Sequence, residues 1–545
     1  MAEENILKKN KNIYEAIDKD INESFNQRIQ TKLTLRKQKF NQIITRKRLS
    51  DLISIINNNE NNSSKWKLLY NINKEKLEMK NNYKFDFKND EDEEILSLSL
   101  KYLNSDKIND IKYSIILLEL FINKHKGHDL TNYINLMFIY DLIHLIEKFI
   151  TNKEIIFNIL YIILRYSNTA DPNLSIILLS PNSYKIWEMC FNLQDYEIFY
   201  EIVCIFNNII LENHIAGCNL LRSSFLKNSI CNFYMADVIT SQMNNSDKKN
   251  IIYNIINNGI ILFCNLFIVN IDNLDRFTKE EIFLSKQQII KVIFTYSSSN
   301  LFHIYHPCIY SIFLATQSES RLIDEFDKNN FIQNILKEKK IFDNDEIKYF
   351  VNTIIGNYIA FKNKIKFSLL IDILSFEKEY LNNCNFANHR KGIFWVLSNM
   401  IICDKNIVSE IIKDEKFLEN LIFYYKNSFS IYELKEISYF FGHLIINADK
   451  EQFIKIEKHK LMEIVIYHAK QTLKNDVEGL LLIFELLEFY FGFGKLMSKY
   501  YEGKNKVIEK FDKLGGKELL DKYINFDNKK LTEQIEYILR EFYDN

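Results

Sequence analysis

Glycine and proline are scarce in this 545-residue chain, which contains 12 glycines and 3 prolines. Enzymes that cradle cofactors and β-sandwiches with many tight turns depend on both residues, because glycine reaches positive φ and proline rigidifies turns. Their scarcity argues against a Rossmann or TIM-barrel enzyme. The chain is instead rich in Ile, Leu, Asn and Lys, a composition that predicts helices joined by polar loops.

The sequence also lacks the short motifs that mark common enzymes. It contains no P-loop, no dinucleotide-binding fingerprint, no H-E-x-x-H and no G-x-S-x-G. His303 and His306 lie three residues apart, but no Cys, Asp or Glu stands at ligand spacing beside them. We therefore expect no metal site, no cofactor and no enzymatic activity.

Paired cysteines and long apolar runs are absent as well. The eight cysteines form no C-x-x-C pair and most lie among apolar residues, which predicts buried free thiols in a reducing compartment. The longest apolar run, residues 259–269, is interrupted by Asn265 and is shorter than the ~18 residues that a membrane span needs. The sequence begins without a signal peptide, so we expect a soluble intracellular protein without membrane insertion.

Charge is unevenly distributed along the chain, although 70 basic and 71 acidic residues nearly cancel. Residues 24–50 include no acidic side chain, and apolar residues such as Ile29, Leu33 and Phe40 are interleaved there at helical spacing. The basic residues of this window are Arg28, Lys32, Arg36, Lys37, Lys39, Arg46, Lys47 and Arg48.

Because like charges repel, we predict that this basic arm is loose when free and folds as a helix on an acidic partner. A solvated tail, a nucleic-acid arm and a membrane-surface helix are the alternative interpretations. The interleaved apolar residues argue against a purely electrostatic nucleic-acid arm, and only Phe40 qualifies as an aromatic membrane anchor. We therefore favour a protein partner and expect no nucleic-acid binding.

The rest of the chain divides by composition. A polar low-complexity stretch at 57–64 and an acidic cluster at 90–94 separate the arm from the first strongly apolar helical pattern. We predict four parts: a disordered tail at 1–24, the basic arm at 25–55, a polar and acidic linker at 56–94, and a helical body at 95–545.

Segments of similar layout recur within that body, each a long apolar helix followed by a polar turn. They centre on Leu164, Asn208, Asn265, Phe313, Asn357, Asn399 and His443, at intervals of 44, 57, 48, 44, 42 and 44 residues. Most intervals fall within the 40–47 residues of HEAT and armadillo repeats. We predict an all-α, right-handed armadillo-repeat solenoid of about ten repeats with a long concave groove; a non-repetitive helical protein is the alternative.

Four segments, in the right order, resemble the importin α (karyopherin α) family. Residues 32–49, KLTLRKQKFNQIITRKRL, resemble its importin-β-binding domain, and residues 94–121 resemble its first armadillo repeat. Residues 389–399, HRKGIFWVLSN, resemble the family's R-K-E-A-C-W-T-I-S-N segment, and residues 508–543 resemble its closing repeat. The chain is thus similar to a divergent importin α.

The resemblance implies a nuclear import adaptor that shuttles between cytoplasm and nucleus. Such an adaptor binds basic nuclear localisation signal (NLS) peptides of cargo proteins in the groove and recruits importin β through the arm. A nuclear export receptor with the Ran GTPase then completes the cycle. The cluster Arg46, Lys47 and Arg48 resembles a short NLS, so the arm is expected to compete with cargo for the groove. The alternative is a degenerate armadillo scaffold that binds specific partners without general NLS recognition.

The peptide site of the family has a simple physical basis. A Trp and an Asn four residues apart lie on one helix face; the Asn amide pairs with the backbone of an extended peptide. The Trp ring packs on a Lys or Arg stem and attracts its charge. The resemblance implies this role for Asn208, Asn265, Asn357, Trp395, Asn399 and Tyr439. It implies that Glu212 is the acidic partner of a cargo Lys and that Glu436 is the acidic partner of a cargo Arg.

The pattern is complete at one helix only. Trp395 and Asn399 form the intact pair, whereas Thr353 stands where the family has an Arg before Asn357, and Tyr439 precedes His443 where the family has Trp and Asn. Cys204 and Ile261 replace the Trp before Asn208 and Asn265.

Overall fold

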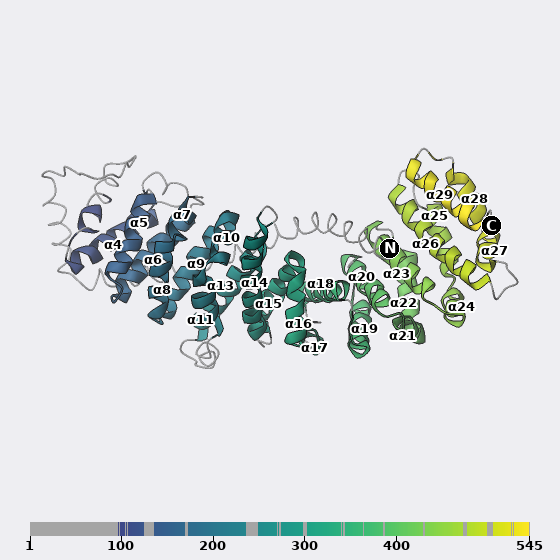
Figure 1. Ribbon diagram of the computed structural model, residues 1–545, viewed down its shortest axis with the longest axis horizontal. Coiled ribbons are helices and arrows are strands. Elements are labelled where there is room, and N and C mark those ends of the chain that lie inside the picture. Colours follow the sequence, from purple (N-terminus) through teal and green to yellow (C-terminus); the bar gives the residue numbers. More distant parts are fainter. Residues whose placement is uncertain are drawn as a thin grey trace. The chain divides into compact units, whose positions relative to one another are not determined.

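The computed structural model describes residues 96–543 with interruptions, the longest at 125–133, 169–172, 236–248, 298–301, 472–476 and 499–504 (Figure 1). The chain divides into two units, Met1–Asn82 and Tyr83–Asn545, and every described residue belongs to the second. The basic arm, with Arg28, Lys32, Arg36, Lys37, Lys39, Arg46, Lys47 and Arg48, lies outside the described residues.

In the described part of the second unit, ten helices follow one another as a ladder, and we call them the ladder helices. Each packs against the next one in chain order. They are α4 (Ile108–Lys124), α6 (Lys153–Ser167), α9 (Tyr196–Glu212), α13 (Lys249–Phe267), α15 (Phe302–Ser318), α18 (Asp345–Phe361), α20 (Ala387–Cys403), α23 (Ile431–Ile446), α26 (Val477–Met497) and α29 (Lys529–Phe542).

Other helices lie between consecutive ladder helices, and most of them are shorter, although α14 and α19 have 22 and 16 residues. They are α5 (Leu136–Lys148), α7 (Leu174–Leu178), α8 (Pro181–Asn192), α10 (His214–Arg222), the π-helix η2 (Leu226–Cys231), α11 (Asn232–Met235), α14 (Arg276–Ser297), the 3₁₀-helix η3 (Ser320–Ile323), α16 (Asp324–Lys328), α17 (Phe331–Ile335), α19 (Phe367–Asn382), α21 (Ile407–Lys413), α22 (Glu415–Asn427), α24 (Lys450–Lys458), α25 (Leu461–Gln471), α27 (Lys506–Lys513) and α28 (Gly516–Ile524).

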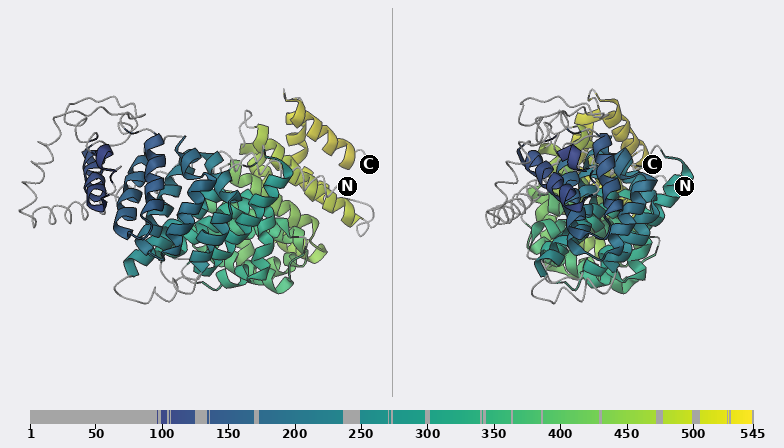
Figure 2. Two further views of the ribbon diagram at one scale, coloured as in Figure 1. Left: turned by 60° about the vertical axis from the view of Figure 1, so that its left-hand side comes forward. Right: turned by 90° about the vertical axis from the view of Figure 1, so that its left-hand side faces the viewer.

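The described part of the chain contains no β-strand. Triplets such as α21–α22–α23 and α24–α25–α26 repeat one three-helix unit, and neighbours in sequence are neighbours in space from each side shown (Figures 1 and 2). All seven landmark positions, from Leu164 to His443, fall in the second half of a ladder helix. The prediction of an all-α armadillo-type solenoid is confirmed.

Several asparagines cap the N-termini of helices. An Asn before a helix accepts hydrogen bonds from backbone N–H groups of the first turn, which would otherwise lack a partner. This N-cap bond is made by Asn152, Asn213, Asn344, Asn505 and Asn528. The aspartate Asp449 makes a reciprocal capping box with Gln452 at the start of α24.

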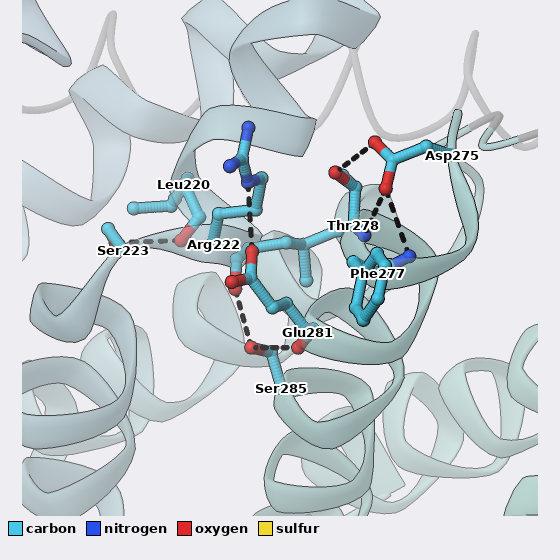
Figure 3. A network of polar contacts seen from close by, with 9 residues as sticks. Leu220, Arg222, Ser223, Asp275, Phe277, Thr278, Glu281 and Ser285 are labelled. Atoms are coloured by element: carbon cyan, nitrogen blue, oxygen red, sulfur yellow. Dashed lines mark hydrogen bonds and ion pairs between the residues drawn. The ribbon is translucent and has the colours of Figure 1, made fainter. Parts of the chain in front are cut away.

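Polar contacts join helices of neighbouring units. Figure 3 shows the junction of α10 and α14, where Arg222 Nε lies 3.1 Å from a carboxylate oxygen of Glu281. The hydroxyl of Ser285, one turn further along α14, donates to the carbonyl of Leu221. At the start of α14, Asp275 accepts from the backbone N–H groups of the two residues after Arg276. The junction therefore has both a fixed helix start and an ion pair across the interface.

A tyrosine–carboxylate contact recurs inside three of the helix triplets. The hydroxyl of a tyrosine in a ladder helix, or directly after it, donates to an acidic residue near the end of a short helix of the same unit. The three pairs are Tyr358–Asp327 at 2.6 Å, Tyr490–Glu457 at 2.6 Å and Tyr543–Asp512 at 2.7 Å. These contacts fix the angle between the two helices, because a short hydrogen bond to a carboxylate is strong and directional.

Candidate peptide-binding face

One side of helix α20 is accessible and carries the intact Trp–Asn pair. Trp395 and Asn399 are half-buried, whereas Phe394 and Leu397 between and beside them are fully buried in the core. The amide nitrogen Nδ2 of Asn399 has no hydrogen-bond partner among the described contacts. A buried donor without a partner is unfavourable, so this amide would gain a hydrogen bond from any acceptor that reaches it.

The ring of Trp395 lies on a glycine of the preceding ladder helix. A Cβ atom built on Gly356 of α18 would lie 2.0 Å from Cζ3 of Trp395, far inside van der Waals contact. Only glycine permits the ring to lie there. Gly356 directly precedes Asn357, so the Trp ring of α20 lies next to the predicted Asn of α18. Gly356 was not among the predicted site residues, although it stands directly before Asn357 in the sequence.

Asn357 and its neighbours on α18 face the same side. Asn357 is half-buried, and its Nδ2 donates to Thr316 Oγ1 at 3.1 Å. Thr353, one turn earlier, donates its hydroxyl to the carbonyl of Tyr349 at 2.9 Å. Asn357 therefore bridges α18 to α15 while it borders the seat of the Trp395 ring.

On α23, the aromatic residue Tyr439 and the imidazole of His443 are half-buried, one helical turn apart. Burial lowers the pKa of His443 to about 4, so its ring is uncharged at neutral pH. The predicted acidic residue Glu436 is buried, with an exposed fraction of 1%.

A second buried carboxylate on α23 was not predicted. Glu433 accepts from Arg390 Nε at 2.6 Å and from Ser428 Oγ at 2.7 Å. Arg390 belongs to α20, so this ion pair joins two ladder helices of the candidate face. The Arg390-Lys391 segment before Trp395 could have indicated this ion pair, because a basic residue that is partly buried needs an acidic partner.

The predicted residues on α9 and α13 lie elsewhere in the packing. Asn208 is 2% exposed, and its Nδ2 donates to Ser167 Oγ at 2.7 Å and to Asn168 Oδ1 at 3.0 Å. Asn265 is 3% exposed and donates to Asn207 Oδ1 at 3.0 Å. Both amides join consecutive ladder helices. Glu212 is the last residue of α9, and its side chain is outside the described part.

The structure thus brings four predicted residues onto three consecutive ladder helices. Asn357, Trp395, Asn399 and Tyr439 lie on the accessible sides of α18, α20 and α23, which pack on one another in that order. We call this surface the α18–α23 face. It combines amides and aromatic rings, which can hydrogen-bond to and pack on an extended cationic peptide.

Metal chemistry has weak support in the described residues. Glu415, Glu419 and His459 place ligand atoms within 4.8 Å of one another, but both glutamates are exposed, and exposed acidic groups gather without a metal in many proteins. His306 Nε2 lies 3.0 Å from a carboxylate oxygen of Glu346. All eight cysteines are free thiols. No helix in the described ranges is long and apolar enough to cross a bilayer.

Comparisons with known proteins show the fold. No protein-family model matches the sequence, and a search of curated proteins finds no relative. Among solved structures, an engineered protein from the Northeast Structural Genomics Consortium has a TM-score of 0.56 at 11% identity, covering 82% of this chain and 98% of that chain. A designed armadillo repeat protein in complex with the peptide (KR)4 has a TM-score of 0.38 at 12% identity, covering 46% and 98%. At 11% identity, the likeness to the first of these structures shows the fold alone, an all-α solenoid of stacked helices.

Proposed function

We propose that this protein is an adaptor that binds an extended basic peptide of a cargo protein on the α18–α23 face. The observation that carries the proposal is the Trp395–Asn399 pair, held on an accessible helix side with its ring seated on Gly356. A Trp face contributes roughly 0.5–2 kcal/mol to the binding of a Lys or Arg side chain. The Asn399 amide then fixes the peptide backbone.

The finer proposal is nuclear import. The basic arm at 25–55 recruits importin β, the α18–α23 face holds the NLS of the cargo, and a nuclear export receptor with the Ran GTPase returns the adaptor. The protein would then shuttle between cytoplasm and nucleus. Support comes from the resemblance of residues 32–49 to the importin-β-binding domain, and from the Trp–Asn pair.

A specific observation favours the alternative of a scaffold without general NLS recognition. Asn208 and Asn265 are buried and already bonded between ladder helices, so the α9–α13 region offers little to a peptide backbone. A protein with one peptide-binding region of this kind can serve a narrow set of partners.

One titration separates the adaptor from the scaffold. Fluorescence anisotropy with a basic NLS peptide and its Lys-to-Ala variant should show at least tenfold weaker binding of the variant if the adaptor proposal holds. Trp395→Ala and Asn399→Ala should each weaken the basic peptide about three- to thirtyfold. Asn427→Ala, an exposed change at the end of α22, is the control. Equal binding of both peptides supports the scaffold.

A second experiment tests the arm. Deleting residues 1–55 should increase the affinity for a basic peptide, because a tethered competitor acts at an effective concentration on the order of mM. The same deletion should abolish binding of importin β in a pull-down. Unchanged peptide affinity would contradict autoinhibition, and retained importin β binding would contradict the role of the arm.

A further inference from the structure

A second aromatic ring is seated on a glycine in the way that Trp395 is. A Cβ atom built on Gly442 of α23 would lie 2.5 Å from Cδ2 and 2.8 Å from Cε2 of Phe489, on the next ladder helix α26. The half-buried ring of Phe489 therefore packs on Gly442 as the Trp395 ring packs on Gly356.

The two glycines hold the same position in their helices. Gly356 directly precedes Asn357, and Gly442 directly precedes His443, the residues that align with Asn399 in the repeat. The ring of Phe489, which lies on Gly442, is therefore the structural counterpart of the Trp395 ring, which lies on Gly356. The repeat spacing in the sequence does not reveal this correspondence. Phe489 lies 50 residues after Tyr439, whereas Tyr439 lies 44 residues after Trp395.

Tyr439 completes a continuous series between these two rings. Trp395, Tyr439 and Phe489 are half-buried on α20, α23 and α26, three ladder helices that pack in that order. Ladder helices of this kind lie about 8–10 Å apart, which is about three residues of an extended chain at ~3.3 Å per residue. One extended peptide can therefore reach all three rings.

The charge around Phe489 favours a cationic side chain. Glu485, one turn before Phe489 on α26, and Glu488, directly before it, are both half-buried carboxylates. Glu488 also accepts from Gln534 Nε2. The imidazole of His443 lies beside Phe489, with ring centroids 5.8 Å apart, and burial lowers its pKa to about 4. Lys495, further along α26, is paired with Glu541 at 2.6 Å.

We propose that Phe489 is a third aromatic position of the peptide-binding face, one ladder helix beyond Tyr439, and that it packs on a lysine or arginine stem of the bound peptide. Gly442 acts as a positioning residue, because it leaves room for the ring. This inference rests on the proposed peptide-binding function and extends its site to α26.

Peptide length gives the test. The probes are labelled peptides of alternating Lys and Arg, one of about four residues and one of about ten, titrated by fluorescence anisotropy against the full chain. Phe489→Ala should weaken the long peptide about three- to tenfold and change the short one less than twofold, since the short peptide still fits across Trp395 and Tyr439. Trp395→Ala should weaken both. Phe423→Ala, an exposed phenylalanine on α22, is the matched control.

The outcomes separate the two proposals. If Phe489→Ala leaves the long peptide unchanged while Trp395→Ala weakens it, the extension to α26 is wrong and the proposed function stands. If neither variant weakens either peptide, the proposed function fails, and the extension fails with it.

The glycine is tested by a double-mutant cycle. Gly442→Ala should match the loss of Phe489→Ala, and the double variant should bind no worse than Phe489→Ala alone, because both changes remove the same ring from its place. The control is Gly492→Ala in α26, where a Cβ atom would have no atom within 4 Å. Additive losses at matched thermal midpoints would show that Gly442 does not act through the ring.

Discussion

Glu377, in α19, is the most unfavourably placed ionisable group that the structure describes. Its side chain is fully buried, and neither carboxylate oxygen has a hydrogen-bond partner among the described contacts. The hydroxyl of Tyr380, one turn further on, is also buried without a described partner. Burial raises the pKa of Glu377 well above its usual value and so favours the protonated carboxyl in the folded protein.

The protonated carboxyl makes stability depend on pH. In the unfolded chain Glu377 ionises near pH 4.3. Unfolding above that pH therefore releases a proton, and stability falls as pH rises towards the folded-state pKa. The slope contributed is at most about 1.4 kcal/mol per pH unit. Glu377→Gln, which cannot ionise, should match the wild-type melting temperature at pH 5 and exceed it at pH 8.

Glu379 gives a control on the same helix. It is exposed, so Glu379→Gln should leave the pH dependence of the melting temperature unchanged. An identical slope for Glu377→Gln and wild type between pH 5 and 8 would refute the buried protonated carboxyl.

The pair Arg390–Glu433 is the main electrostatic link between two elements of the candidate face. Removing Arg390 leaves Glu433, 2% exposed, without its cation, and such an unpaired buried charge costs about 3 kcal/mol. Arg390→Met should therefore lower the urea midpoint strongly. The double variant Arg390→Met, Glu433→Met should recover most of the loss, since no buried charge remains.

An exposed ion pair provides the comparison. Lys413 pairs with Glu410 on α21, with 68% and 31% of their side chains exposed. Lys413→Met should change the urea midpoint very little, because exposed pairs contribute between about 0 and 1 kcal/mol. If Arg390→Met is equally mild, the α20–α23 link is not an important contribution to stability.

At the scale of elements, local periodicity predicted a good part of the structure. The spacing of four residues between Trp395 and Asn399 is enough to place them on one side of α20. Sequence alone could not predict that Asn208 and Asn265 are buried, because their exposure depends on ladder helices 40 or more residues away. Phe489 was missed for a related reason, because α26 is longer than α23 and Phe489 lies outside the 44-residue spacing of the earlier repeats.

In the molecule as a whole, long-range packing runs between neighbouring ladder helices. The stability of such a solenoid is close to a sum of unit terms and nearest-neighbour terms, so a defect in one unit should stay local. Trp187, fully buried in α8 with Nε1 donating to the Leu178 carbonyl at 2.8 Å, and Trp395 in α20 report on distant units.

These two tryptophans allow the locality to be measured. Urea titration of protein labelled with 5-fluorotryptophan, followed by ¹⁹F NMR, should give separate midpoints for Trp187 and Trp395. Arg390→Met should lower the Trp395 midpoint and leave the Trp187 midpoint within error. A shift of equal size at both residues would show that the described unit unfolds as one cooperative body.

The prediction of a helical solenoid from the sequence succeeded because the same pattern of apolar helix and polar turn recurs at similar intervals. Each polar turn and apolar helix was ambiguous alone, but seven landmarks at similar intervals indicated one stacked architecture. The single long helices α14 and α19 stand where units such as α21–α22–α23 have two short helices. They were not foreseen, since nothing in the interval lengths distinguishes them.

Gly356 and Gly442 have one more consequence, for engineering. Replacing a glycine inside a helix by alanine usually stabilises it by about 0.5–1 kcal/mol, so both would be early choices in any effort to raise thermostability. Here the added methyl would push an indole or a phenyl ring out of its slot. A variant library selected for heat resistance alone would tend to lose ligand affinity at these two positions, with every helix still intact.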